Sequence, residues 1–133
     1  CPRCGYLITR MNPNRNTTLW ASFGHAFRGV FYALRTQRNF RIHFAAIVVV
    51  ITAGLWLDIT HYAWALLTLT IGGVLALEML NTALEVFVDL VEPEYHPLAK
   101  RIKDLMAGAV LVSAIAAVIV ALLIFGSSLF ALS

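Results

Sequence analysis

Positive charge is absent from the whole middle of this 133-residue chain, where no Lys or Arg lies between Arg41 and Lys100. Charged residues of both signs make up only 13% of the sequence, hydrophobic residues make up 60%, and the mean hydropathy is +0.80. Soluble domains carry about twice that share of charge, so the composition excludes this class and predicts a membrane protein. The length allows one domain, and no internal repeat is present.

Several familiar motifs are also missing. There is no Gly-rich phosphate loop, no Walker A lysine motif and no protein-kinase signature, so any nucleotide site must be of another design. The first apolar run begins late and has no A-x-A cleavage site behind it, so we expect no signal peptide. Cysteine occurs only as Cys1 and Cys4. Because a closed zinc site is tetrahedral, this pair alone cannot form one, and we expect unmodified thiols rather than zinc.

Three apolar runs are the candidate membrane spans, at roughly residues 42–57, 62–91 and 105–125. Ahead of them, residues 17–36 place large apolar side chains at intervals of three and four, which is typical of an amphipathic helix in the membrane interface. A cytoplasmic helix packed on a partner would give the same pattern. The sequence thus predicts an all-α membrane protein in which three transmembrane helices follow an interfacial helix.

The domain organisation follows from the same patterns. Residues 1–16 are a polar lead that contains the Cys pair, and residues 17–133 form the membrane domain. Seven of the ten Lys and Arg residues precede Ile42, and the other three are Lys100, Arg101 and Lys103. With three spans, both basic segments fall on one side, which the positive-inside rule assigns to the cytoplasm, together with the N-terminus. The net charge of +3 therefore indicates orientation in a membrane and not a nucleic-acid partner.

Four polar residues interrupt the second apolar run: Glu78, Asn81, Glu85 and Asp89. At about 100° per residue, the three acids lie within about 40° of one another around a helix, and Glu78 and Glu85 are roughly 10 Å apart along it. A carboxylate at membrane depth costs several kcal/mol unless it is paired, protonated or metal-bound. A single buried Glu can be a neutral packing residue, but an aligned set indicates a functional site.

A polar loop follows this run, at residues 92–104. Pro93 and Pro97 end the preceding helix, and the loop brings acids and bases to the cytoplasmic end of the acidic column. Lys is suited to binding phosphate, and carboxylates are suited to Mg²⁺. The loop and the column thus carry residue types that suit phosphate and Mg²⁺, although no known phosphate-binding motif is present.

The stretch Glu78-Met79-Leu80-Asn81-Thr82-Ala83-Leu84-Glu85, followed by Asp89, Glu94-Tyr95-His96 and Lys103-Asp104, resembles the small integral-membrane lipid kinases of the bacterial diacylglycerol kinase and undecaprenol kinase family. The resemblance covers roughly residues 23–125. It implies a homotrimer of three-span subunits in the bacterial inner membrane, with active sites between subunits. It also implies transfer of the γ-phosphate of MgATP to a lipid hydroxyl, and a polyprenol such as undecaprenol as the better substrate.

The resemblance also implies a role for each matching residue. Glu78 matches the general base and Glu85 a metal ligand, while Asn81 and Asp89 support the motif. The residues that match nucleotide contacts are Glu94, Tyr95, His96, Lys103 and Asp104. The residues expected at the lipid substrate are Asn39, Arg41, His43 and Trp56. At the position where family members commonly carry a second metal-binding Glu, this chain has Gln37, whose oxygen is neutral.

Two other functions fit the same residues. A catalytically weak family member would serve as a structural or lipid-binding subunit of a larger membrane complex, a role to which Gln37 and the Cys pair would suit it. A proton or cation pathway would also place carboxylates at membrane depth. Transfer of phosphate from ATP to lipid distinguishes the kinase from both alternatives.

Overall fold

The computed structural model describes residues 18–132, with side chains as far as residue 128, so the Cys1 and Cys4 pair and the polar lead lie outside the described residues. Residues 18–132 form helices joined by short connections, with no strand, which confirms the predicted all-α fold class. A boundary between Phe31 and Tyr32 divides the chain into two compact units. The four helices are α2 (Leu19–Thr36), α3 (Arg38–Trp56), α4 (His61–Val91) and α5 (Pro97–Leu132).

The helix α2 coincides with the segment predicted to be amphipathic. Its large apolar side chains are exposed, among them Trp20 at 85% and Phe27 at 74%. Its polar residues interact along the helix, where Arg28 donates a hydrogen bond of 2.9 Å to Nδ1 of His25. A helix that exposes this much aromatic surface suits a membrane interface, which remains a prediction for α2.

The turn between α3 and α4 is short and closely packed. Asp58 has a φ of 46°, a left-handed conformation that Asp tolerates, and Thr60 caps α4 by accepting a hydrogen bond of 3.3 Å from the Ala63 N–H. Gly54 lies against Trp64, and a Cβ at this position would come within 2.9 Å of the indole ring. The two helices therefore approach each other closely at this end because Gly54 has no side chain.

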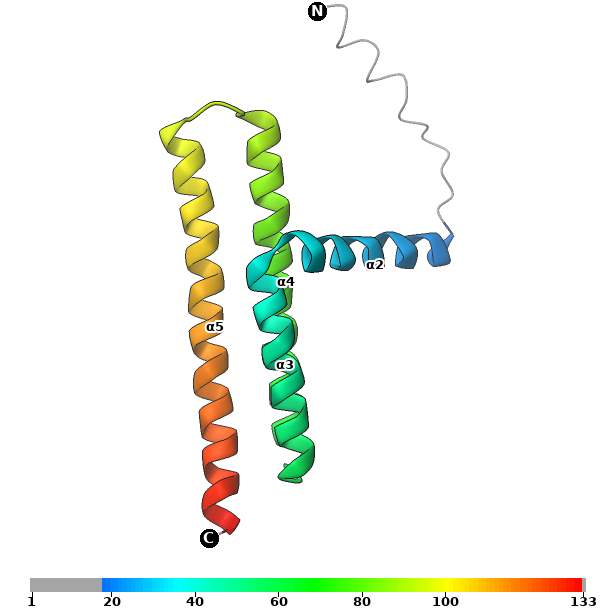
Figure 1. The fold of residues 1–133 in the computed structure, drawn as a ribbon, viewed down its shortest axis with the longest axis vertical. Helices are drawn as coiled ribbons and strands as arrows, with labels where there is room; N and C mark the ends of the chain where they lie inside the picture. Colours follow the sequence, from blue (N-terminus) through cyan, green and yellow to red (C-terminus); the bar gives the residue numbers. More distant parts are fainter. Residues whose placement is uncertain (1–17, 133) are drawn as a thin grey trace, which may run out of the picture. The chain divides into compact units, whose positions relative to one another are not determined.

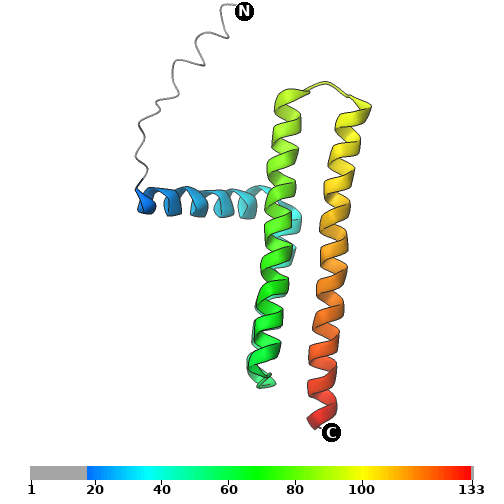
Figure 2. The ribbon, with the colours of Figure 1, turned by 180° about the vertical axis from the view of Figure 1, so that it is seen from behind.

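The connection between α4 and α5 is also capped at both ends. The N–H of Glu92 donates to the Val88 carbonyl at 2.8 Å and closes α4. Pro97 is the first residue of α5, where its missing N–H costs nothing, and Nδ1 of His96 accepts a hydrogen bond of 3.2 Å from the Leu98 N–H. Figures 1 and 2 show that α4 and α5 then run side by side in opposite directions.

The three helices α3, α4 and α5 are each long and apolar enough to cross a membrane. Helix α4 has 31 residues and α5 has 36, which correspond to about 46 and 54 Å, so both exceed a hydrocarbon core of about 30 Å. The expected third span, residues 105–125, lies inside α5. The basic residues of the predicted loop, Lys100, Arg101 and Lys103, belong to the first turns of this helix. At most 17% of the residues in any span are buried within one chain. The remaining apolar faces are therefore available to lipid or to other subunits.

Candidate active site

The carboxylate of Glu78 is buried in the middle of α4. It is only 2% exposed, and one of its oxygens, Oε1, lies 3.0 Å from Nε2 of His43 on α3. The ring is not aligned for a hydrogen bond, so Oε1 has no hydrogen-bond partner among the residues that the structure describes. Thr82, also buried, donates its hydroxyl to the Glu78 carbonyl at 3.0 Å. Because buried polar atoms are nearly always satisfied, an acceptor left free beside a His indicates a place where a proton donor binds.

Glu85 lies one and a half to two turns nearer the loop and is held by two amides. Asn81 donates from Nδ2 to Oε1 of Glu85 at 2.9 Å, and Gln37 donates from Nε2 to Oε2 at 3.5 Å. The oxygen of the Asn81 amide is buried and has no hydrogen-bond partner among the described residues. The structure thus brings Gln37 from the start of α3 to Glu85, and the metal-binding role of the two residues stays a prediction.

This cluster can be compared with the needs of Mg²⁺. No group of three or more His, Cys, Asp or Glu side chains gathers anywhere in residues 18–132. Mg²⁺ is usually held by one or two carboxylates together with waters and substrate phosphates, so Glu85 supplies the carboxylate that it requires. Gln37 contributes an amide oxygen when its side chain turns by 180° about the last bond. The donor set therefore fits a Mg²⁺ ion that arrives with a phosphorylated substrate.

Asp89 lies at the end of the column nearest the connection between α4 and α5. It is exposed and forms an ion pair with Lys103 on α5. Beside this pair is a cleft of about 380 Å³, which is lined by the predicted nucleotide contacts Glu94, Tyr95, His96 and Lys103. Lys100 lines the cleft as well, whereas Asp104 is not among its lining residues. Four of the five predicted contacts are therefore together, and two Lys side chains give the cleft the charge that phosphates require.

The predicted lipid contacts are not gathered in one place. His43 lies against Glu78, but Asn39 and Arg41 are exposed near the start of α3. Trp56 is 81% exposed and follows His43 by thirteen residues, or about 20 Å along the helix. Of the four residues, only His43 contacts the Glu78 carboxylate.

Three features of the site were not identified from the sequence. The first is the contact of His43 with Glu78, which depends on how α3 and α4 align. The second is the cleft position of Lys100, whose place in the sequence was used only to predict the orientation in the membrane. The third is Thr82, which shares a face with Glu78 because it is one helical turn away. Only the spacing of Thr82 gave a signal in the sequence.

The arrangement along α4 suits a transfer of phosphate. From Asp89 to Glu85 is about 6 Å along the helix, and from Glu85 to Glu78 is about 10 Å. The cationic cleft, the carboxylate that fits Mg²⁺ and the buried carboxylate with a free oxygen therefore follow one another from the loop into the span.

Comparison with known proteins finds several named lipid kinases that are similar to this chain. The undecaprenol kinase of Bacillus subtilis (strain 168) is 45% identical over 112 residues, which are 84% of this chain and 91% of that protein. The diacylglycerol kinase of Synechocystis sp. is 57% identical over 103 residues, 77% of this chain, but the match spans only 59% of that longer protein. The diacylglycerol kinase of Escherichia coli (strain K12) is 33% identical over 103 residues, which are 84% of its length.

The family match covers the same region as the site. Residues 24–125 match the family described as prokaryotic diacylglycerol kinase, and this range contains every residue of the candidate site. The family resemblance expected from the sequence is thereby confirmed. The chain belongs to the prokaryotic diacylglycerol kinase family.

Proposed function

We propose that this chain is a lipid kinase that transfers the γ-phosphate of ATP to the hydroxyl of a membrane lipid, with Glu78 as the general base. Membership of a family of kinases supports the use of ATP and a lipid. The observation that carries the assignment to particular residues is the buried Glu78 carboxylate, whose Oε1 has no hydrogen-bond partner in the described part of the chain. A proton or cation pathway does not account for the cationic cleft at the end of the same helix.

The nucleotide occupies the cleft beside the α4 to α5 connection. Lys103 and Lys100 attract the phosphates, and Asp89 holds the Lys103 ammonium in place. The aromatic ring of Tyr95, which is 82% exposed, offers a surface to the base. The charge of the cleft thus directs the triphosphate along α4, toward Glu85.

Glu85 and Gln37 are the residues that would hold Mg²⁺. When bound, the ion neutralises charge on the phosphate oxygens. Asn81 fixes the Glu85 carboxylate through its hydrogen bond of 2.9 Å, so that the oxygens face the incoming phosphate. Because Gln37 brings no charge, the ion is held less tightly than it would be by two carboxylates.

The chemical step takes place between Glu85 and Glu78. The lipid hydroxyl oxygen forms a bond to the γ-phosphorus, the bond from that phosphorus to the bridging oxygen breaks, and ADP leaves with the electron pair. Oε1 of Glu78 accepts the hydroxyl proton, and His43, 3.0 Å away, stabilises the position of the carboxylate. Burial of Glu78 keeps water from competing with the lipid for the phosphate.

A polyprenol is the proposed acceptor. The relative named undecaprenol kinase matches nearly its whole length, whereas the more identical relative named diacylglycerol kinase is matched over 59% of its length. The test is a comparison of kcat/KM for undecaprenol and diacylglycerol in the same detergent micelles. We expect the higher value for undecaprenol, and a higher value for diacylglycerol would reverse the assignment.

The chain is a membrane protein, and we propose that it forms a homotrimer in the bacterial inner membrane. The low burial of the spans within one chain supports an oligomer. The contact of Gln37 with Glu85 supports the orientation, because it places the basic start of α3 at the same end of α4 as the basic first turns of α5. That end, with the N-terminus, is the cytoplasmic one.

A further inference from the structure

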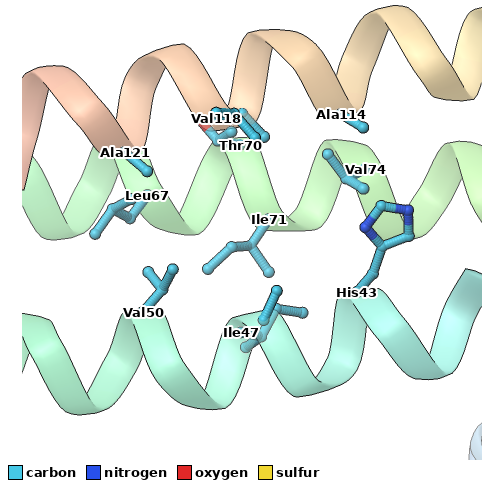
Figure 3. A pocket seen from close by; sticks show the side chains of 12 residues that line it. His43, Ile47, Val50, Leu67, Thr70, Ile71, Val74, Ala114, Val118 and Ala121 are labelled. Atoms are coloured by element: carbon cyan, nitrogen blue, oxygen red, sulfur yellow. The ribbon is translucent and has the colours of Figure 1, made fainter.

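His43 is the one titratable residue in residues 42–56, the apolar part of α3. Figure 3 shows its imidazole extending from α3 toward α4, beside Val74, with the apolar side chain of Ile47 next along α3. The His43 side chain is 23% exposed, and its Nε2 atom lies 3.0 Å from Oε1 of Glu78. One imidazole thus lies against one carboxylate among apolar side chains.

Other charged groups are distant from this contact or face away from it. Helix α5 has no titratable side chain in residues 105–128. Helix α4 presents Glu78 to the imidazole and, about 10 Å further along, Glu85, which two amides hold. Arg41 on α3 is exposed, and because it precedes His43 by two residues it lies on nearly the opposite side of the helix. His43 is therefore the group that is placed to balance the charge of Glu78.

The short distance requires a proton on one of the two atoms. An ionised carboxylate oxygen and an unprotonated ring nitrogen are both acceptors, and two acceptors repel each other at 3.0 Å. If the proton is on Glu78, the carboxyl group is unable to act as a base, whereas a proton on Nε2 leaves it able to do so. An isolated carboxylate is costly at membrane depth, so a protonated neighbour is what permits the ionised form of Glu78.

The direction of the ring leaves the carboxylate oxygen available. The ring is not aligned for a hydrogen bond, and Oε1 of Glu78 has no hydrogen-bond partner among the residues that the structure describes. A carboxylate oxygen has lone pairs for more than one donor, so a second donor has room to approach Oε1. A hydroxyl is therefore able to deliver its proton to Oε1 while the N–H of His43 stays beside the same oxygen.

We propose that His43 is a positioning residue that carries a proton on Nε2 and thereby keeps Glu78 ionised and ready to act as the base. The role of Glu78 as the base rests on the proposed function. In the chemical step the hydroxyl O–H bond breaks and its proton passes to Oε1 of Glu78, while Nε2 of His43 keeps its own proton. This role differs from the lipid contact that was expected of His43 from the sequence, because it predicts a change in kcat and not in the KM for the lipid.

The first experiment uses two amide variants that differ in reach. The amide nitrogen of Gln is as many bonds from Cα as Nε2 of His, whereas that of Asn is one bond closer, so H43Q can place an N–H at Glu78 and H43N cannot. We expect H43N to lower kcat about tenfold or more at about pH 7 and to regain most of it at about pH 9, where an unpaired carboxyl group ionises. H43Q should stay close to the wild type at both pH values, as should H61N, the control at an exposed His.

The variants also show what would refute the role of His43. H43L, which has no N–H in its side chain, takes the place of H43N should that variant fail to fold. Equal kcat values in H43N and H43Q would overturn the inference. A loss of kcat in H43N that is the same at the two pH values would overturn it, and so would a change confined to the KM for the lipid.

The second experiment needs no catalysis. Nitrogen-15 NMR of the His rings, in micelles without ATP or lipid substrate, reports which ring nitrogen of His43 carries a proton, and H43Q identifies the His43 signals by their loss. We expect a proton on Nε2 in the wild type, a different ring state in E78Q, and the same ring state of His61 in both. An unprotonated Nε2 in the wild type, or an unchanged ring state in E78Q, would overturn the inference. A protonated Nε2 in a chain that transfers no phosphate to lipid would support the pairing of His43 with Glu78 and refute the proposed function.

Discussion

Replacement of Glu78 by Gln tests the general base with little change of shape. The side chain is 2% exposed, and Gln has almost the same volume, so the substitution creates no cavity. The amide cannot accept the lipid's proton in the transition state. General-base catalysis typically contributes 10²- to 10⁴-fold, so we expect kcat to fall by at least about 100-fold, or about 2.7 kcal/mol in activation free energy.

The same variant is expected to unfold no more easily than the wild type. A buried carboxylate oxygen without a hydrogen bond costs about 1–3 kcal/mol of folding free energy, and Gln removes the charge that causes most of this cost. A structural role for Glu78 predicts the opposite, because loss of a stabilising contact would lower both stability and activity. The melting temperature therefore distinguishes a base from a packing residue.

The assay is the initial rate of label transfer from ATP to lipid in detergent micelles, together with the melting temperature in the same detergent. D58N is the matched control, since it also exchanges an acid for an amide and Asn tolerates the positive φ of that exposed turn. Retention of more than about a tenth of the wild-type kcat in E78Q would refute the general-base role, because loss of a general base typically lowers kcat by about 100-fold or more.

Three further variants test other parts of the site and the fold. Q37E adds a carboxylate beside Glu85 and should lower the Mg²⁺ concentration for half-maximal activity at saturating ATP; an unchanged or higher value would show that position 37 is not a metal site. K103M should raise the KM for ATP about 10-fold or more, whereas R101M, outside the cleft, should not change it. Equal KM values for ATP in the two variants would exclude the cleft as the nucleotide site. G54A places a Cβ within 2.9 Å of Trp64 and should cost about 1–3 kcal/mol of stability. G72A, where a Cβ meets open space, should be neutral or stabilising. A lower melting temperature for G72A than for G54A would contradict the packing of α3 on α4.

Much of the site follows from helical periodicity alone. The spacing of Glu78, Glu85 and Asp89 placed them on one stripe of a helix, and the hydrogen bond between Asn81 and Glu85 is the contact expected of residues four apart. The helix boundaries near Pro93 and Pro97 also follow from local rules. Features of this kind depend only on residues that are close in the sequence.

The contacts between helices could not be predicted in the same way. The pairs His43 with Glu78 and Lys103 with Asp89 depend on how far one helix is shifted along the next. That shift is set by packing details such as the absence of a side chain at Gly54. Periodicity placed Glu78 and Asp89 on one stripe but gave no measure of their burial, which is 2% exposure for the first and 66% for the second. The difference leaves Glu78 beside His43 in the interior, whereas Asp89 pairs with Lys103 at the surface.

Label transfer from γ-labelled ATP by the purified wild-type chain, with undecaprenol in micelles, tests the lipid kinase most directly. Labelled polyprenyl phosphate should form in an amount equal to the ADP released, and E78Q should form almost none. Without lipid, ADP release should be slow, because the buried Glu78 excludes water from the acceptor position. Rapid ADP release with no labelled product from undecaprenol or diacylglycerol would contradict the assignment of this chain as a lipid kinase.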